Sequence, residues 1–176
     1  MRLVEAGAAV MLKTTEHPRL VIHEDASCLR EVALFRGLAD EEYAKVRGIC
    51  ASTWAAGGTV LFEEGAFGDK CWIIASGEVR ISKMVQNGGE EALAVLKAGD
   101  YFGEMALIDD FPRSAHAIAN TDVALLTISK SALDELLFFD KEIARKILWT
   151  LTRTLSARLR ETNDKMAALL AMGVAW

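Results

Sequence analysis

Residues that build metal centres, disulfide scaffolds and linkers are scarce in this sequence. Its three cysteines, Cys28, Cys50 and Cys71, are widely spaced and form no CxxC pair, which argues against a zinc ribbon, a thioredoxin-type motif or a disulfide framework. We expect them to be small buried hydrophobic residues in a reducing compartment. With only 2 prolines, the chain has no proline-rich linker.

Histidine is equally rare. His17, His23 and His116 do not cluster at metal-ligand spacing, and no HxH, HExxH or GxSxG motif occurs. A cupin-type barrel enzyme needs a histidine-rich metal centre, so we disfavour that alternative. The sequence predicts a protein with no metal, no cofactor and no catalytic activity.

Long apolar runs and a basic excess are also missing. No stretch reaches the roughly 18 apolar residues of a membrane span, and the N-terminus shows no signal peptide. We therefore expect a cytoplasmic protein with no membrane partner. The 20 Lys and Arg against 25 Asp and Glu give a net charge of -5, which argues against a whole surface that binds nucleic acid. A hydrophobic content of 52% excludes wholesale disorder.

The pattern along the chain changes twice. Residues 1–26 are ambiguous and read as an N-terminal arm. Residues 27–128 begin with helix signals at Ser27 and Asp40 and continue with short alternating runs between glycine turns, of which Asn87-Gly88 is the strongest hairpin signal. The predicted strands cover residues 59–62, 71–75, 78–84, 91–96, 115–119 and 124–128. Strands at this spacing predict a mainly β domain, an antiparallel sandwich or barrel with flanking helices.

Residues 129–176 are predicted to be helical. Ser129 is placed to cap one helix, and a longer helix begins at about Lys141. Its seam repeats every seven residues, as expected of a coiled coil that joins two copies of the chain. The seam residues are Leu148, Thr152, Leu155, Leu159, Thr162, Met166 and Leu169. The alternative is a helix that packs only on its own barrel.

One segment interrupts the strand pattern and carries the chemistry. Gly103 precedes four good helix formers, Glu104 to Leu107, which predicts a single helical turn whose free N–H groups attract an anion. Ten residues later, Arg113 can return to neutralise that anion, and Ser114 adds a hydroxyl. An ionised Glu104 accepts hydrogen bonds only, so it suits sugar hydroxyls rather than phosphate. Together these residues predict a phosphosugar site, the alternative being a structural salt bridge between Glu104 and Arg113.

The segments 102–107 (FGEMAL) and 112–115 (PRSA) closely resemble the phosphate-binding cassette of cyclic nucleotide-binding domains. Upstream, 58–65 (GTVLFEEG) and 72–79 (WIIASGEV) resemble early strands of that family, and the similarity extends from about Leu34 to Met166. The resemblance implies an antiparallel jelly-roll barrel with short N-terminal helices, a long C-terminal helix and a nucleotide bound inside.

The resemblance also implies residue roles. Gly103 and Glu104 would bind the ribose, and the phosphate would be bound by Arg113, Ser114, Met105 and Ala106. The base pocket would comprise Leu93, Leu96, Thr162 and Asn163, with Asn163 reaching toward the ligand of a partner subunit. The alternatives are that the apolar residues are plain core and that the Thr162 hydroxyl bonds its own helix backbone.

Ser114 favours cyclic AMP, because it matches the serine of catabolite activators, and cyclic GMP stays open. The DNA-binding segment of transcription factors in this family is absent from the sequence. We therefore expect a regulatory sensor that signals through its C-terminal helices to its own dimer or to an unknown downstream protein. A dimerisation module with a degenerate pocket is the remaining alternative, which the intact Glu104 and Arg113 disfavour.

Overall fold

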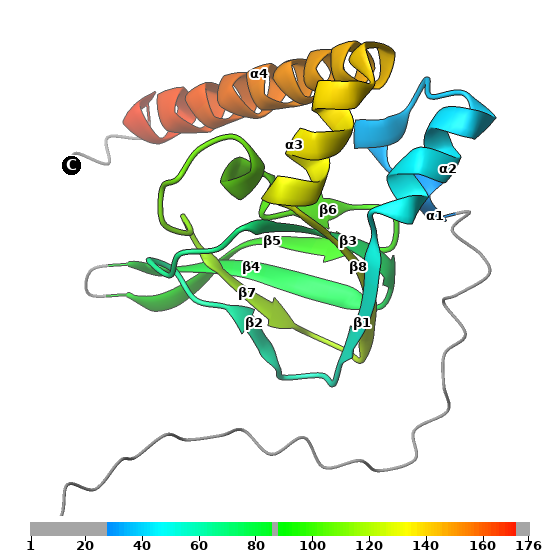
Figure 1. Ribbon diagram of the computed structural model, residues 1–176. Coiled ribbons are helices and arrows are strands. Elements are labelled where there is room, and N and C mark those ends of the chain that lie inside the picture. Colours follow the sequence, from blue (N-terminus) through cyan, green and yellow to red (C-terminus); the bar gives the residue numbers. More distant parts are fainter. Residues whose placement is uncertain (1–27, 86–87, 172–176) are drawn as a thin grey trace, which may run out of the picture.

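The computed structural model describes residues 28–85 and 88–171. Its strands form two four-stranded antiparallel sheets, in the orders β1-β8-β3-β6 and β2-β7-β4-β5 (Figure 1). The strands are β1 (Ala51–Ala55), β2 (Val60–Phe62), β3 (Lys70–Ser76), β4 (Glu78–Val85), β5 (Gly89–Lys97), β6 (Tyr101–Phe102), β7 (His116–Ala119) and β8 (Val123–Ser129). The predicted jelly-roll fold is confirmed, with one refinement: the two sheets are separate and do not close into one barrel.

Two hydrophobic clusters stabilise this arrangement, and β8 belongs to both. Leu125 packs with Ile74 and Phe102 in the cluster between the sheets, whereas Leu126 and Ile128 belong to the cluster beneath the helices. This explains why β8 is buried along almost its whole length rather than alternating. Both clusters therefore pack against the first sheet, which lies between the helical layer and the second sheet.

The helices are α1 (Cys28–Glu31), η1 (Ala33–Phe35), α2 (Asp40–Gly48), η2 (Glu104–Leu107), α3 (Lys130–Phe139) and α4 (Lys141–Ala171). The predicted cap is confirmed, because Ser129 Oγ accepts a hydrogen bond of 3.2 Å from Ala132 N–H. Strands β1 and β6 were not predicted. The predictions for Ser27 and for the turn at Asn87 lie outside the described residues.

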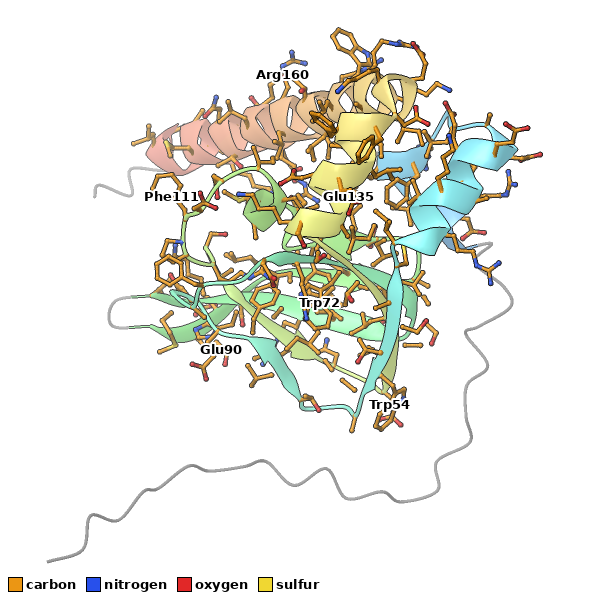
Figure 2. The ribbon with its side chains drawn as sticks, in the orientation of Figure 1. Trp54, Trp72, Glu90, Phe111, Glu135 and Arg160 are labelled. Carbon is orange, nitrogen blue, oxygen red and sulfur yellow. The ribbon has the colours of Figure 1, made fainter. Side chains whose placement is uncertain are left out.

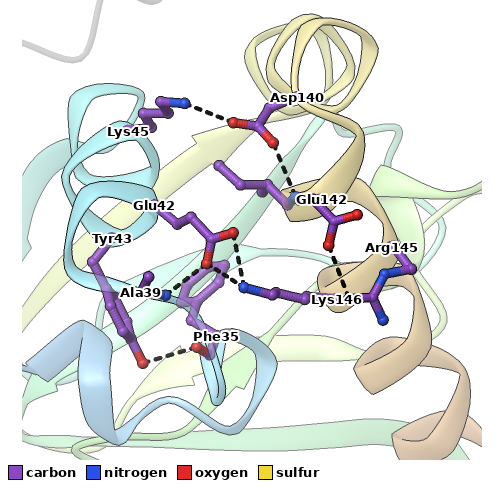
Figure 3. A network of polar contacts seen from close by, with 10 residues as sticks. Phe35, Ala39, Glu42, Tyr43, Lys45, Asp140, Glu142, Arg145 and Lys146 are labelled. Carbon is purple, nitrogen blue, oxygen red and sulfur yellow. Dashed lines mark hydrogen bonds and ion pairs between the residues drawn. The ribbon is translucent and has the colours of Figure 1, made fainter.

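Polar contacts attach α2 to the junction of α3 and α4 (Figure 3). Lys146 donates to both carboxylate oxygens of Glu42, at 2.6 and 2.8 Å, and Lys45 pairs with Asp140 at 2.7 Å. The hydrogen bond from Lys146 holds the pKa of Glu42 below its usual value. The Glu42 carboxylate also accepts from Ala39 N–H at 2.6 Å. These contacts fix where α4 begins.

The two halves of α4 differ in burial. Ile143, Ile147 and Leu151 are buried in the helical cluster, but every side chain described from Ala157 to Ala171 is exposed. At 1.5 Å per residue the helix is about 46 Å long. Its C-terminal half passes over the loop that contains η2 (Figure 1). No helix in the described part of the chain is both long and apolar enough to cross a membrane.

Candidate functional site

A cavity of about 220 Å³ opens between the second sheet, η2 and α4. An engineered cavity of about 150 Å³ holds benzene, so this one accepts a larger ligand. One part of its wall is apolar, formed by Phe62, Ile81, Ala94, Leu96, Phe102 and Ala115. The polar part is formed by Gly103, Glu104, Arg113, Ser114 and Arg158. Such a wall suits a ligand with one flat apolar part and one charged part.

The helical turn predicted after Gly103 is present as η2. Gly103 has φ of +71°, in the left-handed region where a side chain is disfavoured. A Cβ at this position would also lie 2.6 Å from Nη1 of Arg113. Both the turn and the close approach of Arg113 to the backbone therefore require glycine here.

Arg113 is the buried cation of the cavity, with only 8% of its surface exposed. Nη1 donates to the Gly103 carbonyl at 2.9 Å and Nη2 to the Lys70 carbonyl at 2.8 Å. The guanidinium lies 4.2 Å from the centre of the Phe62 ring. Burial lowers its pKa below the usual value, although an arginine stays charged at neutral pH.

The charge of Arg113 is not neutralised by a carboxylate. It forms no ion pair with any Asp or Glu in the described part of the chain, and its Nε is buried without a hydrogen-bond partner there. A buried charge held by two carbonyls and the face of a phenyl ring, without an ion pair, is costly. A bound anion would remove that cost.

Glu104 is also buried, at 4% exposed, but its partner is Arg158 from α4 rather than Arg113. The alternative of a Glu104–Arg113 salt bridge is therefore wrong for this structure. Arg158 also lies 5.7 Å from the centre of the Tyr101 ring. Sequence reasoning missed Arg158, because the contact joins residues 54 positions apart. Its place one helical turn before Thr162 was the available signal.

The predicted site residues divide into two groups. Seven line the cavity together: Gly103, Glu104, Met105, Ala106, Arg113, Ser114 and Leu96. Leu93, Thr162 and Asn163 lie outside it.

The position of Leu93 has a local cause. The register passes from Ile81↔Ala94 to Ser82↔Ala92, which leaves Leu93 unpaired in a bulge. Its side chain is 59% exposed, and Ala94 lines the cavity instead.

Thr162 is exposed, and its hydroxyl donates to the Arg158 carbonyl at 2.8 Å. This is the helix-backbone bond weighed as an alternative to contact with the base. Asn163 is exposed as well. Conversely, Asp109 and Phe111 line the cavity and were not predicted as site residues.

Comparisons with known proteins agree with this geometry. The family model described as "Cyclic nucleotide-binding domain" matches residues 53–139. The N-terminal domain of a transcriptional regulator from Streptomyces coelicolor is 35% identical, with a TM-score of 0.69, over 79% of this chain and 94% of that one.

Two curated relatives point the same way. A CRP-like cAMP-activated global transcriptional regulator of Mycobacterium tuberculosis is 34% identical over 64% of this chain. A cAMP-dependent protein kinase regulatory subunit of Yarrowia lipolytica is 36% identical over 62% of this chain. The match spans 49% of the first relative and 28% of the second. Both are named as regulators. Together with the cassette geometry, these similarities show that the chain belongs to the cyclic nucleotide-binding domain family.

Proposed function

We propose that this protein is a cyclic AMP sensor without catalytic activity, located in the cytoplasm, as the sparse cysteines suggest. The observation that carries the proposal is the buried Arg113, which lies beside Gly103 in the cavity and has no carboxylate partner among the described residues. The Mycobacterium relative, named as cAMP-activated, supports the choice of ligand.

A cyclic nucleotide matches the polar part of the cavity group by group. The phosphodiester carries one negative charge, which Arg113 would neutralise while Ser114 and the N–H groups of η2 donate hydrogen bonds. Glu104 would accept a hydrogen bond from the ribose 2′-hydroxyl. Because Arg158 already neutralises Glu104, the carboxylate would not repel the phosphate as strongly as a free one.

Binding is tested by calorimetry and thermal melting with cyclic AMP, cyclic GMP and linear 5′-AMP. We expect cyclic AMP to bind most tightly and to raise the melting temperature, since ligand at about 100 times its Kd adds about 2.7 kcal/mol of stability. Linear 5′-AMP carries a second phosphate charge and is expected to bind weakly. If neither cyclic nucleotide binds, the alternative of a dimerisation module with a degenerate pocket takes its place.

Thr162 is the residue that would give the site its preference for adenine. Its hydroxyl hydrogen is engaged by the Arg158 carbonyl, so only its lone pairs remain available. A lone pair accepts from the 6-amino group of adenine, whereas guanine carries a carbonyl oxygen, itself only an acceptor, at that position. We therefore propose cyclic AMP as the favoured ligand. Thr162 lies outside the cavity and would contact the base only after α4 moves over it.

Replacing Thr162 by alanine is expected to weaken cyclic AMP binding by about tenfold, the worth of one hydrogen bond, and to leave cyclic GMP binding nearly unchanged. Calorimetry with both nucleotides measures this ratio. Thr152→Ala is the matched control, because that hydroxyl also bonds its own helix, at 2.8 Å to the Leu148 carbonyl, but lies ten residues before Thr162, about 15 Å away along α4. An unaltered ratio in Thr162→Ala would remove Thr162 from recognition.

We further propose that the protein is a homodimer through α4, and that the ligand acts by shifting how α4 lies on the cassette. The seam side chains of Leu148, Leu159 and Met166 are 50%, 62% and 43% exposed. A second copy would cover them, since a heptad seam is self-complementary. The partner that receives the signal would then read the orientation of the paired helices.

Leu159→Lys is expected to shift the protein from dimer to monomer, because two lysines would face each other across the seam. Sedimentation equilibrium measures the change. Arg160→Ala is the control, since Arg160 projects away from the sheets (Figure 2). A wild-type protein that sediments as a monomer at all concentrations would contradict the dimer.

A further inference from the structure

Phe111 is an exposed aromatic residue at the mouth of the cavity. Its surface is 74% exposed, yet the residue is part of the cavity lining. It lies beneath the C-terminal half of α4 (Figure 2). A single exposed phenylalanine is ordinary on a protein surface, so its position relative to the buried groups decides whether it has a role.

The backbone around Phe111 is held on both sides. Its N–H donates to the Asp109 carboxylate at 3.2 Å, and Lys130 pairs with the neighbouring Asp110 at 2.7 Å. On the other side, Arg113 N–H donates to the Ala66 carbonyl at 2.8 Å. The loop thus presents the ring from a fixed support, which lowers the entropy cost of using it for binding.

The burial of the residues around the cavity indicates where each part of the ligand would lie. Arg113 and Glu104 are 8% and 4% exposed, so the groups that would take the phosphate and ribose are the deep ones. The base of a cyclic nucleotide is attached on the far side of the ribose and must therefore lie toward the mouth. Phe111 stands two residues before Arg113, and two residues of extended chain span about 7 Å. This separation lets the Phe111 ring reach past the sugar.

We propose that the Phe111 ring stacks on the base of the bound nucleotide and makes the site prefer purines. This inference rests on the proposed binding of cyclic nucleotides and adds the residue that selects among them. Aromatic stacking depends on the area of the base and not on its hydrogen-bonding edge. A two-ring purine gains more from Phe111 than a one-ring pyrimidine does.

The test measures binding of cyclic AMP, cyclic CMP and ribose 3′,5′-cyclic phosphate, which has no base, to wild type and Phe111→Ala. Loss of one stacked base corresponds to a decrease in affinity of about 5- to 150-fold. We expect that loss for cyclic AMP, a smaller loss for cyclic CMP and none for the compound without a base. Phe111→Trp keeps a stacking ring and should retain the affinity for cyclic AMP.

Phe67→Ala is the matched control. Phe67 is 80% exposed and follows Ala66, whose carbonyl accepts from Arg113, but it does not line the cavity. Its removal should leave all three affinities unchanged.

Equal losses for cyclic AMP and the compound without a base in Phe111→Ala would overturn the stacking role while leaving the proposed function intact. So would an unchanged affinity for cyclic AMP. If the wild-type protein binds neither cyclic AMP nor cyclic CMP, both proposals are overturned.

Discussion

Replacing Arg113 by glutamate is expected to abolish cyclic nucleotide binding. The substitution removes the cation of the cavity and puts a carboxylate where the phosphate would lie. Hydrogen bonds to a charged group contribute about 1.5–3 kcal/mol each, so losing two of them and adding repulsion predicts a decrease in affinity of more than about 100-fold. Titration calorimetry with cyclic AMP measures the loss.

Arg113 also has a structural role, because it donates to the carbonyls of Gly103 and Lys70. Circular dichroism must therefore show that Arg113→Glu is folded. Arg113→Lys provides a second test that keeps the charge but loses the planar fork of donors. It is expected to bind cyclic AMP about tenfold more weakly than wild type. Unchanged affinity in either folded variant would refute the phosphate site.

The second large effect is expected at the Glu104–Arg158 pair. Arg158→Met leaves the Glu104 carboxylate, which is 4% exposed in the wild-type structure, without its partner. Breaking a fully buried pair costs about 3–5 kcal/mol. Since the Arg158 side chain is 47% exposed, we expect a decrease of about 2–3 kcal/mol in the free energy of unfolding, below that range. Urea denaturation of the ligand-free protein measures it.

The double variant Glu104→Gln/Arg158→Met is the control for this pair. Without the buried charge, it should recover most of the lost stability, so the two substitutions should be strongly non-additive. Glu104→Gln alone should bind cyclic AMP more weakly and 2′-deoxy cyclic AMP no more weakly than wild type, because only the former offers the 2′-hydroxyl. Additive stabilities would mean that the pair contributes little to folding.

The cassette was predictable because its information is local. Gly103, Glu104 and Arg113 lie within one short segment, and their residue types alone indicate an anion site beside a sugar site. The order of helices and most strands followed from periodicity and turn residues in the same way.

The features that were not predicted depend on longer-range geometry. The exposure of Leu93 results from a bulge against β4, which shifts the alternation of β5 by one residue. Arg158 reaches Glu104 only because α4 folds back over the cassette. Strand β6 has two residues, Tyr101–Phe102, too few to show a period. Each case requires knowing what lies opposite a residue, which spacing within one segment does not give.

The uneven burial of α4 has a mechanical consequence. The helix is packed against the core up to Leu151, its last buried residue, and Arg158 connects it to the cavity through Glu104. Measured from Leu151, Arg158 lies about 10 Å along the axis and Ala171 about 30 Å. If the helix tilts rigidly about that support, its far end moves about three times as far as Arg158 does. A displacement of a few tenths of an ångström at the Glu104 carboxylate would become about one ångström at the far end of the helix, where a second helix would be packed.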